Sequence, residues 1–128
     1  MHVTPEKAQK LLLRVDPGQV LEGLAVGLRD GAVLALVAAD LTATEIANLR
    51  ATRVRQIRGH LLVRVTRHEV AWTATLPPHL GARLIAWLLE SRLWAEDKPL
   101  FLGRRGLPLT RVGVSKVIDR YAKEQPHV

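Results

Sequence analysis

Six arginines lie close together in this sequence, and their guanidinium groups are the side chains best suited to bind a ligand. The segment between Ile46 and His68 contains no aspartate or glutamate, and its arginines are Arg50, Arg53, Arg55, Arg58, Arg64 and Arg67. A guanidinium presents a rigid fork of donors that matches a phosphate group. Clustered positive charge also favours a polyanion, because binding releases condensed counterions. The segment therefore predicts a phosphate-binding surface, whereas a solvated basic surface without a ligand is the alternative.

The net charge of the chain comes almost entirely from this segment. The sequence has 19 lysines and arginines against 12 acids, a net charge of +7, and without the six arginines 13 basic residues face 12 acidic ones. Aromatic residues make up 4% of the chain, too few for the stacking surfaces that bind single strands. The composition therefore favours duplex DNA as the partner.

Several other classes of function are not expected. The chain has no cysteine, its five histidines lack the spacing of metal ligands, and no glycine-rich phosphate loop is present. We therefore predict no metal, no cofactor and no small-molecule substrate. The longest apolar run, Ala32–Ala39, is too short to cross a membrane. The 128 residues predict one domain, residues 1–128, in the cytoplasm, associated with the nucleoid if bound to DNA.

The first part of the chain predicts helices. Thr4-Pro5-Glu6 favours a helix start, with a hydroxyl N-cap, a proline in the first turn and an acid near the helix dipole. The apolar face over Val20–Leu28 predicts a short helix interrupted by glycines. Asp30 is expected to cap a buried central helix over Ala32–Ala39. Thr42-Ala43-Thr44-Glu45 matches the capping box and predicts a further helix.

The middle of the chain changes to an alternating pattern that is typical of strands. Apolar and polar residues alternate over residues 61–66 and again over 70–75. Turns at Arg58-Gly59 and at residues 67–69 bound these segments, so residues 53–57 are expected to supply a third strand. The pattern predicts an antiparallel three-stranded meander that presents the arginines.

The last part predicts helices again. Pro77-Pro78 ends the sheet and starts a helix with an apolar stripe of Leu80, Leu84, Trp87, Leu88 and Trp94. A basic loop over residues 103–108 follows, and Thr110 caps a last helix that buries Tyr121. Arg104 and Arg105 in this loop, and Arg111 after it, are further candidate DNA contacts.

Six segments resemble one known family in order and at similar spacing. They are Thr4-Pro5-Glu6, the LRDGAVL of residues 28–34, the DLTATEIANLR of residues 40–50, and the later segments at 76–80, 99–101 and 103–110. Together they resemble the catalytic domain of tyrosine recombinases, the phage integrase family. The resemblance covers almost the whole chain. It implies a mainly helical fold with a small three-stranded antiparallel sheet, lacking the C-terminal part of that domain.

The resemblance also bears on catalysis. The family breaks and rejoins DNA through a phosphotyrosine link, with two arginines, a hairpin lysine and a tyrosine nucleophile. Thr42 stands at the first arginine position, and Arg67 lies close to the hairpin lysine as a possible remnant of the catalytic set. A threonine cannot replace a guanidinium fork. The family's His-x-x-Arg motif and nucleophilic tyrosine have no counterpart before Val128. We therefore assign no catalytic residue.

Three hypotheses follow from the sequence. The leading one is a catalytically inactive, integrase-like protein that binds duplex DNA through the arginine-rich meander. The second is a fragment or split part of an active site-specific recombinase, with the missing half supplied by another chain. The third is a protein-interaction module that binds an intact recombinase or a second copy of itself.

Overall fold

Five helices and one three-stranded sheet make up the described part of the chain. The computed structural model describes residues 3–123. Its elements in order are α1 (Pro5–Leu12), α2 (Val26–Ala38), α3 (Ala43–Ala47), a 3-10 turn (Ala51–Arg53), β1 (Val54–Ile57), β2 (His60–Arg67), β3 (Val70–Leu76), α4 (Pro78–Ser91), a second 3-10 turn (Arg104–Gly106) and α5 (Arg111–Lys123). The predicted fold class is confirmed.

The sheet is the predicted antiparallel meander, with strand order β1-β2-β3. Arg58-Gly59 and His68-Glu69 form its two turns, and all four residues have positive φ. Such two-residue turns match the right-handed twist of paired strands. Alternate residues of β2, Leu61, Val63 and Val65, are buried, while Arg64 between them is exposed. One face of the sheet therefore joins the core and the other faces solvent.

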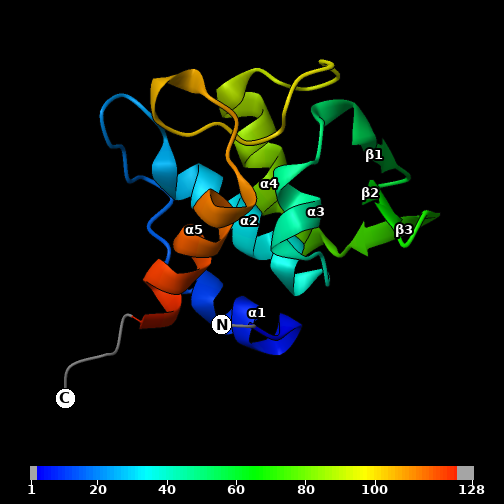
Figure 1. Cartoon of the computed structure of the whole chain (residues 1–128), viewed down its shortest axis with the longest axis horizontal. Helices are drawn as coiled ribbons and strands as arrows, with labels where there is room; N and C mark the ends of the chain where they lie inside the picture. The colour runs from blue at the N-terminus through cyan, green and yellow to red at the C-terminus, as the bar shows by residue number, and fades with distance from the viewer. Residues whose placement is uncertain (1–2, 124–128) are drawn as a thin grey trace.

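The helices form the body of the molecule, and α2 lies at its centre (Figure 1). Residues 32–36 of α2 are completely buried, because α1, α4 and α5 all pack against this helix. The sheet projects from one side of the body, next to α3, and β3 leads directly into α4 (Figure 1). The buried apolar residues of helices and sheet form a continuous core.

All three predicted hydroxyl caps, at Thr4, Thr42 and Thr110, are confirmed. The Thr4 hydroxyl accepts a hydrogen bond from the backbone N–H of Lys7 at 3.2 Å. At α3, the Thr42 hydroxyl accepts from the N–H of Glu45, and the Glu45 carboxylate accepts from the N–H of Thr42. This is the reciprocal capping box that the sequence predicted.

Two predicted helix boundaries are wrong. Residues 21–24 form a tight turn closed by a Leu21–Leu24 bridge instead of a helix, and α2 begins at Val26, before the predicted start at Ala32. Asp30 therefore lies inside α2 and does not cap it. The second error concerns α4, which ends at Ser91 because Arg92 adopts a left-handed conformation. Trp94 consequently lies beyond the helix and is 38% exposed.

Asp30 instead carries a buried polar network that joins α2 to α5. Its side chain is fully buried, and Oδ1 accepts from the Nε of Arg29 at 3.0 Å. Oδ2 accepts from the Tyr121 hydroxyl at 2.8 Å and from Arg120 at 3.3 Å. Burial, with the bond to Asp30, raises the pKa of the Tyr121 hydroxyl. Tyr121 is therefore a core residue, as predicted.

We expect Asp30→Asn to destabilise the fold by about 3 kcal/mol, because the substitution leaves the buried guanidinium of Arg29 without a charged partner. Asp97→Asn is the matched control, since Asp97 makes an exposed ion pair with Arg50. The control should cost less than about 1 kcal/mol. Urea unfolding followed by tryptophan fluorescence measures both, and equal losses would contradict this role of Asp30.

Candidate nucleic-acid interface

The solvent face of the sheet carries three of the predicted arginines around one open hollow. Arg53 comes from the 3-10 turn, Arg55 from β1 and Arg64 from β2. The hollow is lined by these three together with Thr52, Leu62, Ala71 and Thr73. The register pairs Arg55 with Leu62, which places Arg55 on the same face as Arg64. Arg53 and Arg55 thus meet without sharing a strand, contrary to the prediction.

These three side chains are available to a ligand. All three are exposed. Among residues 3–123, no carboxylate forms an ion pair with Arg53, Arg55 or Arg64, and the same holds for Arg58 at the tip of the β1–β2 turn. Their charges are therefore not neutralised by this part of the chain. A second crevice shares Arg53 and Arg64 with the hollow and is lined on its other side by residues of α3, Glu45 among them, and by Asn48.

Arg67 lies on the other face of the sheet and is occupied by acidic partners. Its guanidinium makes two hydrogen bonds to Glu45, at 2.7 and 2.8 Å, and one to the backbone carbonyl of Asp40 at 2.7 Å. The guanidinium carbon also lies 4.1 Å from the centre of the Trp72 ring, a cation–π contact. Arg67 therefore fastens the β2–β3 hairpin to α3.

The contact between Arg67 and Glu45 shifts the pKa of each group so that its charged form is favoured. The bond from Arg67 holds the pKa of the Glu45 carboxyl below its usual value of 4.5. The same bond raises the pKa of the Arg67 guanidinium. A guanidinium in this state is a very poor proton donor to a leaving oxygen.

Arg50 is also partnered, on a third part of the surface. Its Nε donates to the Asp97 carboxylate at 2.7 Å, and a second nitrogen donates to the Asp97 carbonyl at 2.7 Å. Both side chains are exposed, so the pair contributes little to stability. The prediction that all six arginines form one surface is therefore wrong for Arg50 and Arg67.

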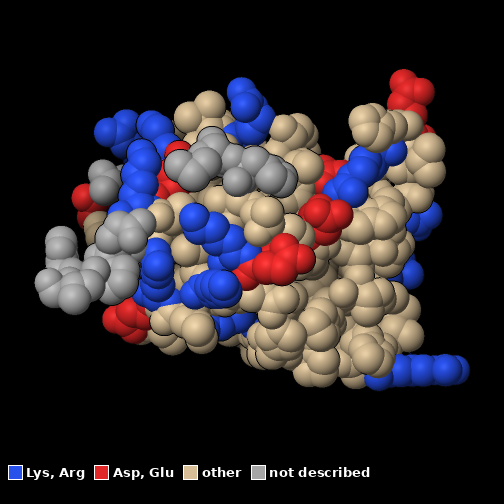
Figure 2. Space-filling model, turned by 90° about the horizontal axis from the view of Figure 1, so that it is seen from below, with Lys and Arg blue, Asp and Glu red and all other residues tan. Residues whose placement is uncertain are grey.

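Two other candidate arginines, Arg105 and Arg111, do not line the hollow. Arg105 lies in the second 3-10 turn, beside the Leu21–Leu24 turn, and Arg111 is exposed in the first turn of α5. In Figure 1 this loop and α5 lie on the side of the body away from the sheet. The side chain of Arg104 is outside the described residues. Figure 2 shows basic and acidic side chains interspersed over the face seen from below.

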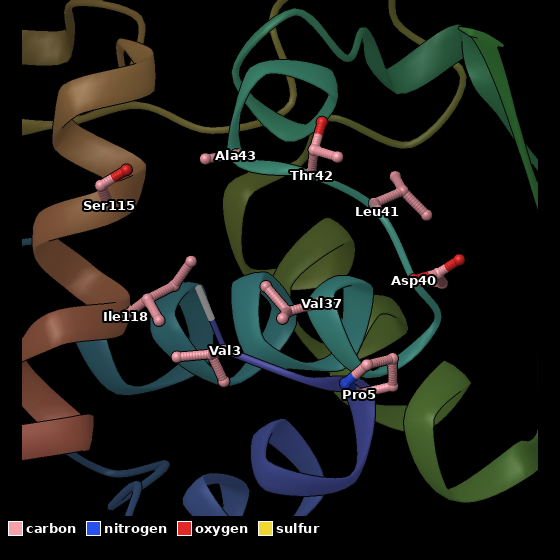
Figure 3. Close-up of a pocket in the computed structure, with 9 residues that line it drawn as sticks. All are labelled: Val3, Pro5, Val37, Asp40, Leu41, Thr42, Ala43, Ser115 and Ile118. Carbon is pink, nitrogen blue, oxygen red and sulfur yellow. The ribbon is translucent and has the colours of Figure 1, made fainter. Parts of the chain in front are cut away.

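The predicted first-arginine position, Thr42, borders a separate crevice (Figure 3). This crevice lies between the N-terminal segment, the end of α2 and α5, and most of its wall is apolar, as Val37, Leu41 and Ile118 illustrate. None of its lining residues is basic. It therefore offers no positive charge to hold a phosphate at Thr42.

The comparisons with known proteins give structural matches alone. No protein-family model matches the chain, and no curated protein matches it. Among solved structures, the chain is similar to the XerH site-specific recombinase bound to difH substrate in a pre-cleavage complex, with a TM-score of 0.60 and 16% identity. A post-cleavage complex of XerH with palindromic difH substrate gives a TM-score of 0.64 and 17% identity. The chain has a recombinase-like fold.

The recombinase-like fold extends over nearly all of this chain. Each match covers 98% of its residues, but only 38% and 37% of the two recombinase chains. The chain thus spans well under half the length of the recombinases that it resembles. At this identity the likeness shows the fold, and function depends on the chain's own residues.

The structure can also be searched for a metal site and for a membrane-spanning helix. Among the described residues, no group of three or more His, Asp and Glu is placed to hold a metal ion. No helix in the described part is long and apolar enough to span a bilayer.

The sequence did not predict the role of Glu45 as partner of Arg67, although the spacing of Glu45 from Thr42 marked it as part of a capping box. This role becomes visible only in the folded structure, where α3 packs beside β2.

Glu45→Gln tests the fastening of the hairpin. A glutamine retains the capping-box acceptor but loses the charge, so we expect a loss of about 1–3 kcal/mol at pH 7. Because the pKa of Glu45 is lowered on folding, this contribution is present above pH 4.5 and disappears as the pH falls through the lowered value. Urea unfolding at several pH values measures it, with the exposed Glu96→Gln as control. A difference that persists at low pH would contradict the ion-pair explanation.

Proposed function

We propose that this chain binds duplex DNA through the solvent face of its sheet, with Arg53, Arg55 and Arg64 as the central contacts and Arg58 at the rim. The observation that carries the proposal is the hollow in which three exposed arginines converge without acidic partners among the described residues. Guanidinium groups so placed can donate to adjacent phosphates of one backbone. The likeness to recombinases described as bound to their DNA substrate supports this partner.

The proposal assigns the contacts unequally among the predicted arginines. Arg50 and Arg67 are engaged with Asp97 and Glu45, so a phosphate at either would have to displace a carboxylate. Arg105 and Arg111 are remote from the hollow and are at most secondary contacts. Binding is therefore expected to be phosphate-driven, with sequence preference limited to arginines that reach base edges.

The proposal further holds that the chain alone does not cleave DNA. Thr42 uses its hydroxyl to cap α3, and Arg67 is held in an ion pair. Tyr121, the one tyrosine in the sequence, is 4% exposed and donates its hydroxyl to Asp30. A buried phenol with a raised pKa is neither accessible to a phosphodiester nor ready to ionise. This chain thus supports binding without the nucleophile that cleavage requires.

The central contacts are tested by salt dependence. If Arg53, Arg55 and Arg64 each neutralise one phosphate, replacing all three by alanine should reduce the log–log slope of affinity against salt by about 2.7. Fluorescence anisotropy with a labelled duplex at four or more salt concentrations gives the slope. The matched control is Lys7→Ala/Lys10→Ala/Lys116→Ala, which removes the same charge from exposed positions on α1 and α5. If the two triple variants change the slope equally, general charge and not the hollow explains binding.

The lack of cleavage is tested with supercoiled plasmid. We expect the plasmid to remain supercoiled with the chain alone, and we expect no covalent protein–DNA adduct after denaturation. An adduct lost in Tyr121→Phe would overturn this part of the proposal. Relaxation only after adding a second polypeptide with a tyrosine nucleophile would favour the split-recombinase hypothesis instead.

A further inference from the structure

The outer edge of β3 is open and carries no charge. The strand reads Val-Ala-Trp-Thr-Ala-Thr-Leu, without proline, glycine or a charged residue, and within residues 3–123 it pairs only with β2. In Figure 1 no other helix or strand lies beyond it. Proteins usually protect such an edge with charges, prolines or bulges, because its unpaired backbone groups accept another strand. The opposite edge, β1, has four residues and carries Arg55.

The hairpin geometry determines which groups face outward. A two-residue turn makes Arg67 and Val70 a hydrogen-bonded pair, so Val70, Trp72, Ala74 and Leu76 direct their N–H and C=O groups to β2. The alternate residues Ala71, Thr73 and Thr75 direct theirs to the open edge. All three are exposed, and no backbone hydrogen bond from another described element reaches them. Each of these three residues has one N–H and one C=O group, so six backbone groups are available for pairing.

We propose that this edge pairs with β3 of a second copy of the chain when both are bound to the same duplex, an inference that rests on the proposed function. Thr73 is the middle residue of β3 and one of the outward-facing residues. An antiparallel arrangement centred on it pairs Thr73 with Thr73 of the second copy, and Ala71 with Thr75. This register overlaps the whole strand and uses all six outward groups. No like charges oppose each other within it.

The two-fold axis of such a pair also suits DNA. Antiparallel strands of one continuous sheet are related by an axis perpendicular to the sheet, so the solvent faces of both copies point the same way. The two arginine hollows then lie on one side of a six-stranded sheet. The two β2 strands, each of which carries Arg64, lie three strand spacings apart in this sheet, roughly 14 Å. At physiological salt, the repulsion between them is largely screened.

The size of the contact explains why DNA is needed. Pairing of two seven-residue strands buries far less surface than the roughly 1,200 Å² of a stable interface. Free copies should therefore remain monomeric at micromolar concentration. Two copies on one duplex have an effective concentration in the millimolar range, which allows a weak contact to form.

The absence of cysteine from the sequence makes a direct test possible. In the pair, the two Thr73 α-carbons would lie about 5.5 Å apart, within the range that a disulfide spans. Under oxidising conditions, Thr73→Cys should therefore form a disulfide-linked dimer on a duplex of about 30 base pairs, which is long enough for two copies, and several-fold less dimer on one of about 10. A thiol reductant should return this dimer to monomer. Thr66→Cys, exposed on the central strand, is the control and should not cross-link above its level without DNA.

A second pair of variants measures cooperativity. Thr75→Pro removes an outward N–H without touching the bonds to β2, whereas Thr75→Val retains it. On the long duplex we expect cooperative binding by wild type and Thr75→Val, and its loss in Thr75→Pro. Binding to the short duplex should be equal for all three.

The outcomes separate the two proposals. Binding to both duplexes with equal cross-linking at positions 73 and 66 overturns the β3 pairing and leaves the proposed function intact. Capture of β3 by a strand from another protein, without Thr73→Cys homodimers, overturns it as well. Failure to bind either duplex overturns the proposed function and this inference with it.

Discussion

The carboxylate of Glu45 is the contact on which the relation between helices and sheet depends. One oxygen accepts from the backbone of Thr42 at 2.9 Å and from Arg67 at 2.7 Å, while the other accepts from the Nε of Arg67 at 2.8 Å. A single side chain thus completes the cap of α3 and fastens the β2–β3 hairpin to it. Since β2 also carries Arg64, the same contact sets where the basic face of the sheet lies relative to the helical body.

The period of two along a strand explains why neighbouring arginines have different roles. Arg64 and Arg67 both lie on β2, but they are three positions apart, and an odd separation places two side chains on opposite faces of a strand. One therefore faces solvent, and the other faces α3, where a buried or half-buried guanidinium requires an acidic partner. Charge that is clustered along the sequence is therefore divided by the sheet. Of the two arginines on β2, Arg64 alone is left without an acidic partner among the described residues.

Features that depend on residues close together in the sequence could be predicted, whereas contacts between distant residues could not. The capping box at Thr42, the caps at Thr4 and Thr110, and the alternating strands depend on neighbours within a few residues, and the structure confirms all of them. The role of Asp30 depends on Tyr121, 91 residues away, so its position before an apolar run was misread as a cap. The pairing of Arg50 with Asp97, 47 residues away, was hidden for the same reason. An adjacent Arg-Asp pair within an otherwise apolar helix was the one available sign of a buried network.

A recombinase-like fold does not by itself place a phosphate at the capping box of α3. Helix capping and phosphate binding make different demands at Thr42: the cap needs a short acceptor that folds back on the backbone, whereas a phosphate needs donors that project outward. Here the hydroxyl serves the cap, the nearest guanidinium is neutralised by Glu45, and the adjoining crevice is walled by apolar side chains. Unneutralised positive charge is instead found across the sheet, around Arg53, Arg55 and Arg64. The arginines to which we assign DNA binding are thus separate from the capping box, so the proposed binding does not require any chemistry there.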